Sequence, residues 1–500
     1  MAQTIAERVA QVLTLSPDTA AVEFQGVSTT WRQLEAAALA VEAHLSDLGI
    51  SKEAPIGWVA RNGPASVAAF VALLRAARPI APLRPNQTID IFKGDIRDQK
   101  LKAVVGGGAD WDLPGVIDTA REAGSAGVRI DADAAGNLAA GLIPGIDTVG
   151  PGPHRDDAPG MVVERLSSGT TGPPKRIPVT VEKMLPALGA AEESQASSQE
   201  ALRIKTSPAI VLAPFTHAGG IFGLLMAMYQ ARPVVLFDKF EVDRWVKAVQ
   251  TYRPKAASLV PAMIRMVLES DTPKEALASL RVVRSGTAAL DPDTQRAFEE
   301  RFGMPVLIDY GAAEFLGGVA GWSLPDHQKF AEAKRGSVGR PRSDVQLRTV
   351  DPDTGALQKT GEVGQLEIFS RRFSPDWIRT NDLARLDEDG FLYIHGRTDD
   401  AINRGGFKIL PDEIAPIIRQ YPGVREATVV GFPDQRLGQV PVAIIEATGA
   451  DIDPEALKAF LKERLAFYQV PVDVKFIDAF PRTTSLKISR PELKAMLGLA

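Results

Sequence analysis

The sequence predicts an α/β fold in which a large N-terminal domain precedes a small C-terminal one, and three observations lead to this prediction. Short apolar runs alternate with helical spacing over the first 110 residues, which is typical of a parallel sheet with crossover helices. From about residue 344, strand-like runs follow one another with little helix between them, so a β-rich subdomain is expected there. After a polar break at residues 396–400, the α/β alternation returns.

The N-terminal elements follow from the spacing of apolar residues. Residues 31–48 carry apolar side chains at helical spacing, and residues 65–77 are almost wholly apolar, which predicts a buried helix. Residues 56–60 and 80–83 are predicted to be strands on either side of that second helix. Residues 106–159 are rich in glycine, alanine, aspartate and proline, and this composition predicts a peripheral, loop-rich connection.

The remaining elements continue this organisation toward the C-terminus. Further short strands are predicted at 162–166, 209–212, 233–237, 257–260, 280–284 and 306–308. The β-rich subdomain is predicted to hold strands at 345–350, 365–369 and 391–394. The last hundred residues are predicted to form a helix, two strands, a helix and a strand, at 412–420, 426–432, 440–446, 454–465 and 474–477. We therefore predict two domains, residues 1–396 and residues 397–500.

Composition excludes several classes of function. The chain has 500 residues, of which 45% are hydrophobic and 24% charged, as in ordinary globular proteins. Its net charge of -5 provides no basic excess for binding nucleic acid non-specifically. It has no cysteine, so disulfides, thiolate metal sites and a cysteine nucleophile are excluded. The N-terminus lacks a signal-peptide pattern and no apolar run reaches the roughly 20 residues of a membrane span, so we expect a cytoplasmic protein.

A Ser/Thr/Gly loop carries the strongest chemical signal. Residues 166–175 have the sequence LSSGTTGPPK, directly after an apolar strand. Glycines allow backbone N–H groups to approach a phosphate, hydroxyls add donors, and Lys175 adds a positive charge. The loop is not a Walker A motif, because Pro174 precedes the lysine and Arg176 follows it. The alternative is a flexible Ser/Gly linker, which the preceding strand and the lysine disfavour.

Together with six further segments, this loop makes the chain resemble the AMP-forming adenylating enzymes. That family includes acyl-CoA synthetases, carrier-protein adenylation domains and luciferases, and the chain is most similar to a carboxylic acid–CoA ligase. The matching segments occur in family order at 214–219 (PFTHAG), 285–290 (SGTAAL), 310–314 (YGAAE), 380–382 (TND), 396–408 (GRTDDAINRGGFK) and 481–487 (PRTTSLK). The resemblance implies that residues 1–396 hold the ATP and acid sites, and that residues 397–500 form a small mobile α+β domain carrying the catalytic lysine.

The resemblance also implies a role for each matching residue. The catalytic residues would be Lys487, Glu314 and Thr170, with Glu314 also holding Mg²⁺. The nucleotide-binding residues would be Ser167, Ser168, Gly169, Thr171, Gly172, Lys175, Gly286, Thr287, Ala288, Asp309, Tyr310, Gly311, Ala313, Asp382, Ile394 and Arg397. The acyl pocket would contain Phe215, His217 and Gly219, the hinge Asp399, and the CoA tunnel Arg404, Gly405, Gly406, Phe407 and Lys408.

The implied chemistry explains these residue types. A carboxylate attacks the α-phosphate of ATP, so two anions must meet and positive charge has to be supplied. Lys487 would bridge the two anions, Asp382 would accept hydrogen bonds from the ribose hydroxyls, and Tyr310 would stack on adenine. Each of these residues has an ordinary alternative: a solvated lysine, a turn aspartate and a core tyrosine. For Gly405 and Gly406 the alternative is a simple turn.

Four residues depart from the family pattern. Arg176, Asn381 and Leu486 each stand where the family has glycine. Ala313 stands in place of a threonine whose hydroxyl would contact the nucleotide phosphate, a loss of about 1–3 kcal/mol. The other motif residues are present, so catalysis is still expected.

The sequence therefore predicts an ATP-dependent, AMP-forming acid–CoA ligase that uses ATP, Mg²⁺ and coenzyme A, in fatty-acid or aromatic-acid metabolism. Its substrate is expected to be a hydrophobic or aromatic acid, because Phe215, Phe222 and residues 315–322 could line an apolar pocket. Two alternatives stay open: an enzyme that loads a separate acyl carrier protein, and an impaired paralogue that binds nucleotide without turnover. The sequence leaves the oligomeric state open, although homodimers are common in the family.

Overall fold

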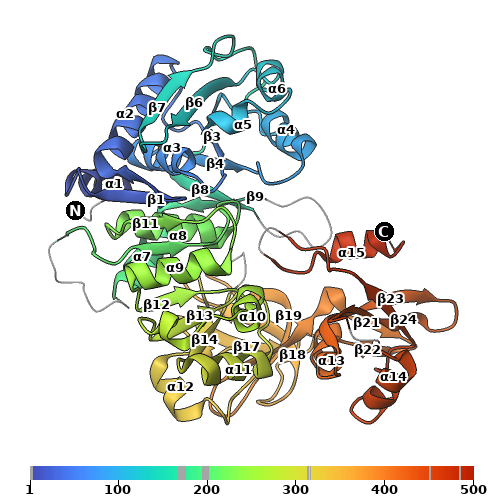
Figure 1. Ribbon diagram of the computed structural model, residues 1–500. Helices are drawn as coiled ribbons and strands as arrows, with labels where there is room; N and C mark the ends of the chain where they lie inside the picture. The colour runs from blue at the N-terminus through green and yellow to red at the C-terminus, as the bar shows by residue number, and fades with distance from the viewer. Residues whose placement is uncertain are drawn as a thin grey trace. The chain divides into compact units, whose positions relative to one another are not determined.

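The computed structural model describes residues 4–166, 176–193, 202–311, 315, 317–449, 452–483 and 486–499 (Figure 1). These residues form an α/β protein, which confirms the predicted fold class. Internal contacts divide the chain into two compact units. Unit 1 contains Met1–Ala257, Ser270–Arg281 and Ala313–Gly317, and unit 2 contains Ser258–Glu269, Val282–Ala312 and Gly318–Ala500. The boundary between residues 396 and 397 stays a prediction.

Unit 1 is built on a seven-stranded sheet of order β7-β6-β5-β3-β4-β8-β9. The strands are β3 (Ile56–Val59), β4 (Ile80–Leu83), β5 (Ala103–Gly107), β6 (Ala126–Ala132), β7 (Leu138–Leu142), β8 (Met161–Leu166) and β9 (Arg176–Thr180). The pairs β3–β4, β3–β5, β4–β8 and β5–β6 are parallel, and the edge pairs β6–β7 and β8–β9 are antiparallel. Helices cover both faces of the parallel part, which explains the continuous apolar runs of the sequence.

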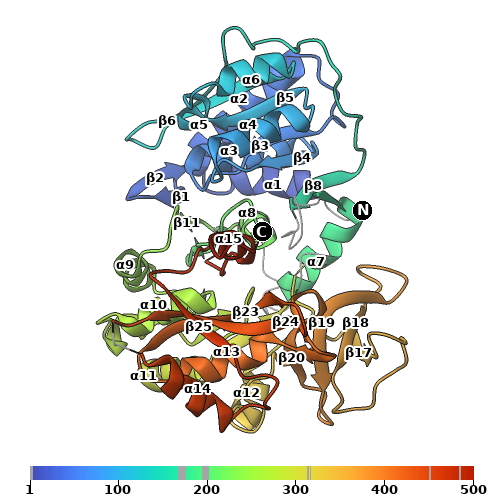
Figure 2. The same ribbon diagram turned by 90° about the vertical axis from the view of Figure 1, so that its right-hand side faces the viewer.

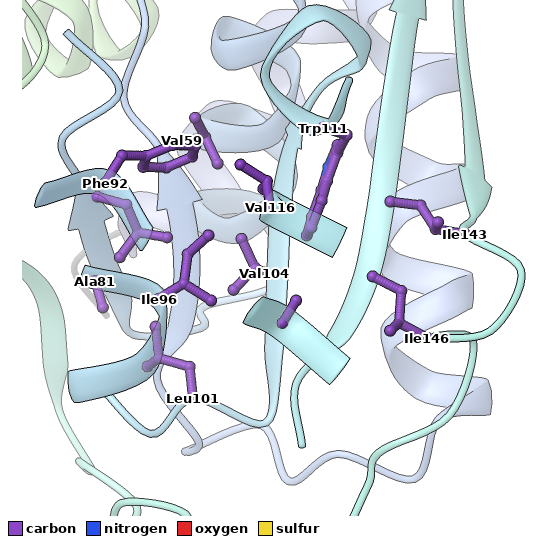
Figure 3. Packing of buried hydrophobic residues seen from close by; sticks show 12 residues of the cluster. Val59, Ala81, Phe92, Ile96, Leu101, Val104, Trp111, Val116, Ile143 and Ile146 are labelled. Carbon is purple, nitrogen blue, oxygen red and sulfur yellow. The ribbon is translucent and has the colours of Figure 1, made fainter. Parts of the chain in front are cut away.

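Successive residues of β3 point to opposite faces of this sheet. Trp58 packs on one face against Phe70 of α3 (Pro64–Arg75), with 4.8 Å between the ring centroids. Val59 belongs to a buried cluster on the other face, with Phe92 of α4 (Ile89–Asp98) and Trp111 of α5 (Gly108–Trp111), as Figure 3 shows. Truncation of one of these aromatic side chains to alanine would cost about 3–5 kcal/mol.

The prediction of a loop-rich connection is wrong for residues 106–142. This stretch contains α5, α6 (Val116–Glu122), β6 and β7, and Trp111 is fully buried within it. The glycines of this stretch allow neighbouring side chains to pack closely against the backbone. A Cβ on Gly127 would lie 2.4 Å from Ile146 Cδ1, so a larger residue would force the neighbouring side chain to move.

A second sheet of unit 1 has the order β10-β11-β1-β2. Its strands are β1 (Ala20–Phe24), β2 (Val27–Thr30), β10 (Ala209–Val211) and β11 (Val234–Leu236). The remaining helices of the unit are α1 (Ile5–Thr14), α2 (Trp31–Asp47), α7 (Val181–Glu193), α8 (Ala218–Tyr229), α9 (Val242–Tyr252) and the 3-10 helix η1 (Lys274–Leu277). Thr30 begins α2 through a capping box with Gln33. Across the described residues of the chain, every helix is too short or too polar to cross a membrane.

Unit 2 contains the strands β13 (Val282–Ser285), β14 (Val306–Tyr310), β15 (Ala320–Gly321) and β16 (Arg340–Pro341) of one sheet, and an antiparallel sheet of order β17-β18-β19-β20. The boundary between the units in the sequence falls within β12 (Ala256–Ser258). Three helices of unit 2 accompany the first sheet: α10 (Pro261–Glu269), α11 (Pro292–Phe302) and α12 (Leu324–Phe330). The second has β17 (Gln346–Val350), β18 (Gly364–Phe369), β19 (Ile378–Leu386) and β20 (Leu392–Arg397). The sequence reading missed β19, because polar residues interrupt its apolar alternation (IRTNDLARL).

The last sheet of unit 2 has the order β22-β21-β24-β23, and β25 (Asp473–Ile477) pairs with β24. The other strands are β21 (Ile402–Arg404), β22 (Phe407–Ile409), β23 (Val424–Asp434) and β24 (Gly438–Ala447). Helices α13 (Pro411–Arg419) and α14 (Pro454–Lys462) cover the face to which Val429 points, with Ile414 and Leu457 in one buried cluster (Figure 2). Helix α15 (Arg490–Met496) contributes Leu493 to a second cluster with Val430, on the opposite face.

Candidate functional site

Tyr310, Asp382 and Arg397 lie together in unit 2, on β14, β19 and β20. The phenolic hydroxyl of Tyr310 donates a hydrogen bond to Asp382 Oδ2. The antiparallel register of β19 and β20 places Asp382 opposite Arg397, whose Nη1 lies 3.7 Å from Asp382 Oδ1. Asp382 is buried, with 9% of its surface exposed. Pairing of β19 with β20 thus brings Asp382 and Arg397 together, and the hydrogen bond from Tyr310 connects them to β14 of the other sheet. All three residues were predicted to bind nucleotide.

Asp399, the predicted hinge residue, binds the same guanidinium. Arg397 Nε and Nη2 each lie 2.8 Å from a different carboxylate oxygen of Asp399, which is a bidentate geometry. Asn381 Nδ2 lies 3.4 Å from Asp399 Oδ2, and Thr398 Oγ1 donates to Asn381 O at 3.2 Å. Asn381, one of the departures from the family, therefore supports the short 3-10 turn η2 (Thr398–Asp400).

Lys487 lies on a tight turn that hydrogen bonds hold closed. Thr483 N donates to Lys487 O at 2.8 Å, and Lys487 N donates to Thr483 Oγ1 at 3.3 Å. Arg482 and Ile488 form a β-bridge across the turn, and Arg482 Nη1 donates to Leu486 O at 3.0 Å. Leu486 has a φ of 62°, in the left-handed region that glycine favours. Leu486 therefore adopts a backbone conformation that glycine takes at no steric cost, and the leucine is strained there.

The Lys487 side chain lies within electrostatic reach of Arg397 and Asp382. Burial lowers the pKa of Lys487, the positive charge of Arg397 lowers this pKa further, and Asp382 partly opposes the effect. Among the described residues, no carboxylate lies within the 4.0 Å ion-pair distance of the ammonium. A half-buried cation in this state would be stabilised by an incoming carboxylate or phosphate.

Sequence reasoning missed Arg490, the first residue of α15. Its guanidinium forms an ion pair with Asp400, and Nη2 lies 2.9 Å from Asp412 Oδ1. Burial raises the pKa of Asp412. The only signal in the sequence was the position of Arg490 three residues after Lys487. Arg490 joins the start of α15 to the turn η2 and to the start of α13.

The predicted adenine-side loop follows β13. A Cβ on Gly286 would lie 2.9 Å from Asp309 O, so this close approach requires glycine. Thr287 has a φ of 71°, and both Thr287 and Ala288 are exposed. Asp309 on β14 accepts a hydrogen bond from Arg284 Nη1 at 3.0 Å. The loop therefore lies against β14, the strand that ends at Tyr310.

Gly311 and Ile394, which were also predicted to bind nucleotide, occupy the same two sheets. Gly311 follows Tyr310 directly after β14 and is exposed. Ile394 lies on β20 opposite Ala384 and is half-buried. Gly311 adjoins Tyr310 in sequence, and Ile394 lies on the same strand as Arg397.

The residues predicted to line the acyl pocket lie in unit 1, at the start of α8. Phe215 is fully buried: its backbone N donates to Asn62 Oδ1 at 2.9 Å, and its ring centroid lies 5.6 Å from that of Trp58. His217 is the N-cap residue of α8. An added Cβ on Gly219 would meet no atom within 4 Å. Phe215 thus contributes to the core of unit 1, whereas Gly219 leaves open space.

Residues 405–406, the two glycines of the predicted CoA tunnel, form the turn between β21 and β22. Their φ values of 55° and 93° fit a two-residue hairpin turn. Phe407 stacks on Tyr468, with 4.4 Å between the centroids, and Arg404 Nη1 donates to Tyr468 O at 2.7 Å. Lys408 is exposed. The hairpin is thereby fixed to the segment before β25.

Several predicted residues lie outside the described residues, so the structure places none of them. They are Ser167, Ser168, Gly169, Thr170, Thr171, Gly172, Lys175, Ala313 and Glu314. The searched part of the chain, which excludes these residues, holds no group of three or more histidine, aspartate or glutamate side chains that could bind a metal ion.

Arg176, another departure from the family, points into the interior of unit 1. Its side chain is 16% exposed, and Nη1 donates to Pro82 O at 2.9 Å. The same nitrogen lies 3.3 Å from Glu164 Oε2, and Nη2 lies 3.7 Å from Asp95 Oδ1. Arg155 contacts the other oxygen of Glu164 at 2.5 Å. Arg176 therefore anchors the start of β9 to β4 and β8.

Two family models match the chain. The model described as "AMP-binding enzyme" matches residues 9–371, and the model described as "AMP-binding enzyme C-terminal domain" matches residues 413–487. Among curated proteins, the sulfoacetate–CoA ligase of Cupriavidus necator is 32% identical over 359 residues, which are 68% of each chain. The oxalate–CoA ligase of Arabidopsis thaliana is 27% identical over 478 residues, 89% of each chain. The match to the 4-coumarate–CoA ligase-like 5 of Oryza sativa, at 30% identity, spans 65% of this chain and 60% of that protein.

Solved structures show the same fold over nearly the whole chain. ATP-bound MatB from Rhodopseudomonas palustris has a TM-score of 0.82 at 23% identity, covering 98% of both chains. The amide bond synthetase McbA from Marinactinospora thermotolerans has a TM-score of 0.79 at 23% identity, covering 99% of this chain and 100% of its own.

Proposed function

This chain belongs to the AMP-binding enzyme family, in the group of acid–CoA ligases, and we propose that it joins a carboxylic acid to coenzyme A in two half-reactions. In the first, a carboxylate oxygen attacks the α-phosphorus of ATP and pyrophosphate leaves, which gives an acyl-adenylate. In the second, the thiol of coenzyme A loses its proton, its sulfur attacks the acyl carbonyl, and AMP leaves as the thioester forms.

The observation that carries this proposal is the half-buried ammonium of Lys487 beside Arg397 and Asp382, without a carboxylate at ion-pair distance among the described residues. Two anions must meet in the first half-reaction, so a cation placed where charge develops lowers the barrier strongly. Lys487 would contact the acid and the α-phosphate oxygens. The lowered pKa of Lys487 supports this role, because an incoming anion offsets the cost of keeping the amine charged.

The other contacts in this part of unit 2 support a nucleotide site. Asp382 is held between Tyr310 and Arg397, and its carboxylate would accept hydrogen bonds from the ribose hydroxyls. The ring of Tyr310 would stack on adenine, and its hydrogen bond to Asp382 would fix the ring plane. The loop at residues 167–175 would bind the β- and γ-phosphates. We propose Glu314 as the protein ligand of Mg²⁺, which needs only one or two carboxylates beside the substrate phosphates and would neutralise phosphate charge when bound.

The second half-reaction would use residues 397–500 in a different position. Asp399 would be the hinge, and the hairpin at residues 405–406 would lie along the pantetheine arm of coenzyme A. The positive φ values of both glycines support this role, since a turn without side chains allows a ligand to approach the backbone.

For the acid we propose a hydrophobic or aromatic carboxylate. The apolar helix α8 and the open space at Gly219 support this choice. The acids named in the relatives range from the aromatic 4-coumarate to the small dianions oxalate and sulfoacetate. The substrate class therefore has to be measured on this protein.

The test is pyrophosphate release with ATP and Mg²⁺ against a panel of short, medium, long, aryl, alicyclic and dianionic acids. Each acid is assayed with coenzyme A and, in parallel, with hydroxylamine, which traps the acyl-adenylate as a hydroxamate. We expect release with one class of acid, together with the matching acyl-CoA by mass spectrometry. Lys487→Ala should abolish the release, and Lys494→Ala, on the exposed side of α15, is the matched control.

The panel also separates the remaining alternatives. Hydroxamate without acyl-CoA would replace the proposal by an enzyme that loads an acyl carrier protein. No release with any acid, combined with binding of ATP in calorimetry, would replace it by a nucleotide-binding paralogue without turnover.

A further inference from the structure

A buried carboxylate joins the Lys487 turn to two helices of unit 2. Glu426 lies on β23, and 5% of its side chain is exposed. Three guanidiniums surround it: Arg265 Nη2 at 2.5 Å from Oε2, Arg419 Nη1 at 3.1 Å from Oε1, and Arg482 Nη2 at 3.8 Å from Oε2. They come from α10, from α13 and from the segment that enters the Lys487 turn. These four residues are called the Glu426 cluster below.

Arg482 connects the Glu426 cluster to the turn. Its Nη2 faces Glu426, while its Nη1 donates to Leu486 O at 3.0 Å. Leu486 is the residue with left-handed φ that precedes Lys487. A guanidinium presents several donors in one rigid plane, so a single arginine can hold both groups at a fixed separation. Arg482 thereby links the Glu426 carboxylate to the backbone directly before Lys487.

Arg265 is the member of the Glu426 cluster that lies outside residues 397–500. It belongs to α10, in the segment Ser258–Glu269 of unit 2. If residues 397–500 turn about Asp399 for the second half-reaction, the contact between Arg265 and Glu426 has to open. The contact therefore belongs to the arrangement in which Lys487 lies near Arg397 and Asp382.

We propose that Arg482 and Glu426 are positioning residues for Lys487, and that Arg265 secures them only in the arrangement that forms the acyl-adenylate. The inference rests on the function proposed above. A misplacement of about 1 Å at a catalytic group can reduce a rate about 100-fold. Loss of the hydrogen bond from Arg482 to Leu486 O would permit such a misplacement, because the backbone of this turn is strained.

The test compares Arg482→Met and Arg265→Met with the control Arg425→Met. Arg425 is the neighbour of Glu426 on β23, is 52% exposed and pairs with Glu446 at 3.6 Å. In each variant the Glu426 cluster keeps two arginines, so its carboxylate stays paired and the fold should survive. Two rates are measured on the full chain, with the acid that the unmodified enzyme activates: hydroxamate formation from ATP and acid, and acyl-CoA formation from the preformed acyl-adenylate.

Arg482→Met should lower kcat for hydroxamate formation about 10- to 100-fold. The KM for ATP should stay within about twofold, because Tyr310, Asp382 and Arg397 keep their contacts. Acyl-CoA formation from the preformed acyl-adenylate should change by less than about twofold, since that step does not use Lys487. Arg265→Met should show a smaller loss with the same selectivity, and Arg482→Lys should restore part of kcat. Arg425→Met should leave both rates unchanged.

Equal losses of both rates in Arg482→Met and Arg265→Met would show a merely structural role and overturn the inference, as would unchanged rates in both variants. Lys487→Ala separates this inference from the proposed function. If Lys487→Ala still forms hydroxamate, the proposed function fails. If Lys487→Ala loses it while Arg482→Met does not, only the positioning inference fails.

Discussion

Two clusters of arginine and carboxylate, one in each unit, use their charges differently. In unit 1, Arg155 and Arg176 contact Glu164 at 2.5 and 3.3 Å, and 4% of the glutamate side chain is exposed. In unit 2, Asp399 binds Arg397 through both carboxylate oxygens. The neighbouring Lys487, in contrast, has no carboxylate at ion-pair distance among the described residues. Paired buried charges fix a strand in place, whereas a half-buried cation without such a pair is available to an anionic ligand.

The same contrast separates two residues that replace family glycines. Arg176 follows Lys175, which the resemblance assigns to nucleotide binding, and Leu486 precedes Lys487, which it assigns to catalysis. The side chain of Arg176 packs into the cluster of unit 1, where it contacts Glu164 and Pro82 O. Leu486 instead adopts the left-handed backbone itself, with a φ of 62°. A departure from a motif can therefore be absorbed by side-chain pairing in one unit and by backbone strain in the other.

Asp382→Asn should have the largest effect on the unit 2 cluster. The neutral amide weakens the contacts with Tyr310 and Arg397 and with a ribose hydroxyl. Hydrogen bonds to charged groups contribute about 1.5–3 kcal/mol, so the KM for ATP should rise about 10- to 100-fold. Asp387→Asn is the control, because Asp387 directly follows β19 and its carboxylate pairs with Lys334 at 2.9 Å rather than with Tyr310 or Arg397. An equal rise in the control would contradict the assignment.

The pH dependence of adenylation should follow the lowered pKa of Lys487. Because burial and Arg397 favour the neutral amine, the charged form is lost at a lower pH than for an exposed lysine, whose pKa is about 10.4. The basic limb of kcat/KM for hydroxamate formation should therefore begin below that value. Lys487→Arg keeps its charge and should move this limb upward. An unchanged limb would show that another group titrates.

The same shift has a consequence for stability. The pKa of Lys487 is lower in the folded state than in the unfolded chain, so the folded state binds a proton less readily. The free energy of unfolding therefore decreases as the pH falls from the unfolded to the folded pKa of this lysine. Its charge is thus unfavourable to folding at neutral pH. Lys487→Met should therefore raise Tm at pH 7 and lose this advantage above the pKa of an exposed lysine. A lower Tm at pH 7 would contradict the sign.

Arg176→Gly, which restores the family residue, should test the unit 1 cluster. Loss of the contacts with Glu164 and Pro82 O should lower the free energy of unfolding by about 1–3 kcal/mol, measured by urea denaturation. At a temperature where both proteins are folded, the rate of hydroxamate formation should be unchanged. A large loss of rate with unchanged stability would instead place Arg176 in the catalytic site.

Leu486→Gly should have the smallest effect. A left-handed non-glycine residue costs about 1–2 kcal/mol, and the greater freedom of glycine in the unfolded chain offsets about 0.5–1 kcal/mol of the gain. The free energy of unfolding should therefore rise by about 1 kcal/mol or less. Leu486→Ala removes the side chain but keeps the strain, so the difference between the two variants isolates the backbone term. A less stable glycine variant would contradict the strained turn.

The fold was predictable wherever a local pattern of apolar residues indicates which side chains are buried. Strands such as β3 and β4 appear as apolar runs because both faces of their sheet are covered. β19 was missed because its inner and outer residues do not alternate cleanly, and residues 106–142 were misread because glycine was taken as a sign of loops. In Gly127 the missing side chain reflects the approach of Ile146.

The site was predictable only in part, for a related reason. The resemblance identified Tyr310, Asp382, Arg397 and Lys487. Strand pairing brings Asp382 and Arg397 together, and a side-chain hydrogen bond joins Tyr310 to Asp382. Glu426 left no local signal, because the partners of a buried ion pair come from distant segments and only the folded chain shows them. The same holds for the carboxylates that bind Arg490.

The central claim is that Lys487 serves the first half-reaction and not the second. Its most direct test is to measure both rates in Lys487→Ala: hydroxamate formation from ATP and acid, and acyl-CoA formation from the preformed acyl-adenylate. Loss of one cation at the point of developing charge should reduce the first rate about 100-fold or more. The second rate should stay close to that of the unmodified enzyme. An equal fall in both rates would contradict the account.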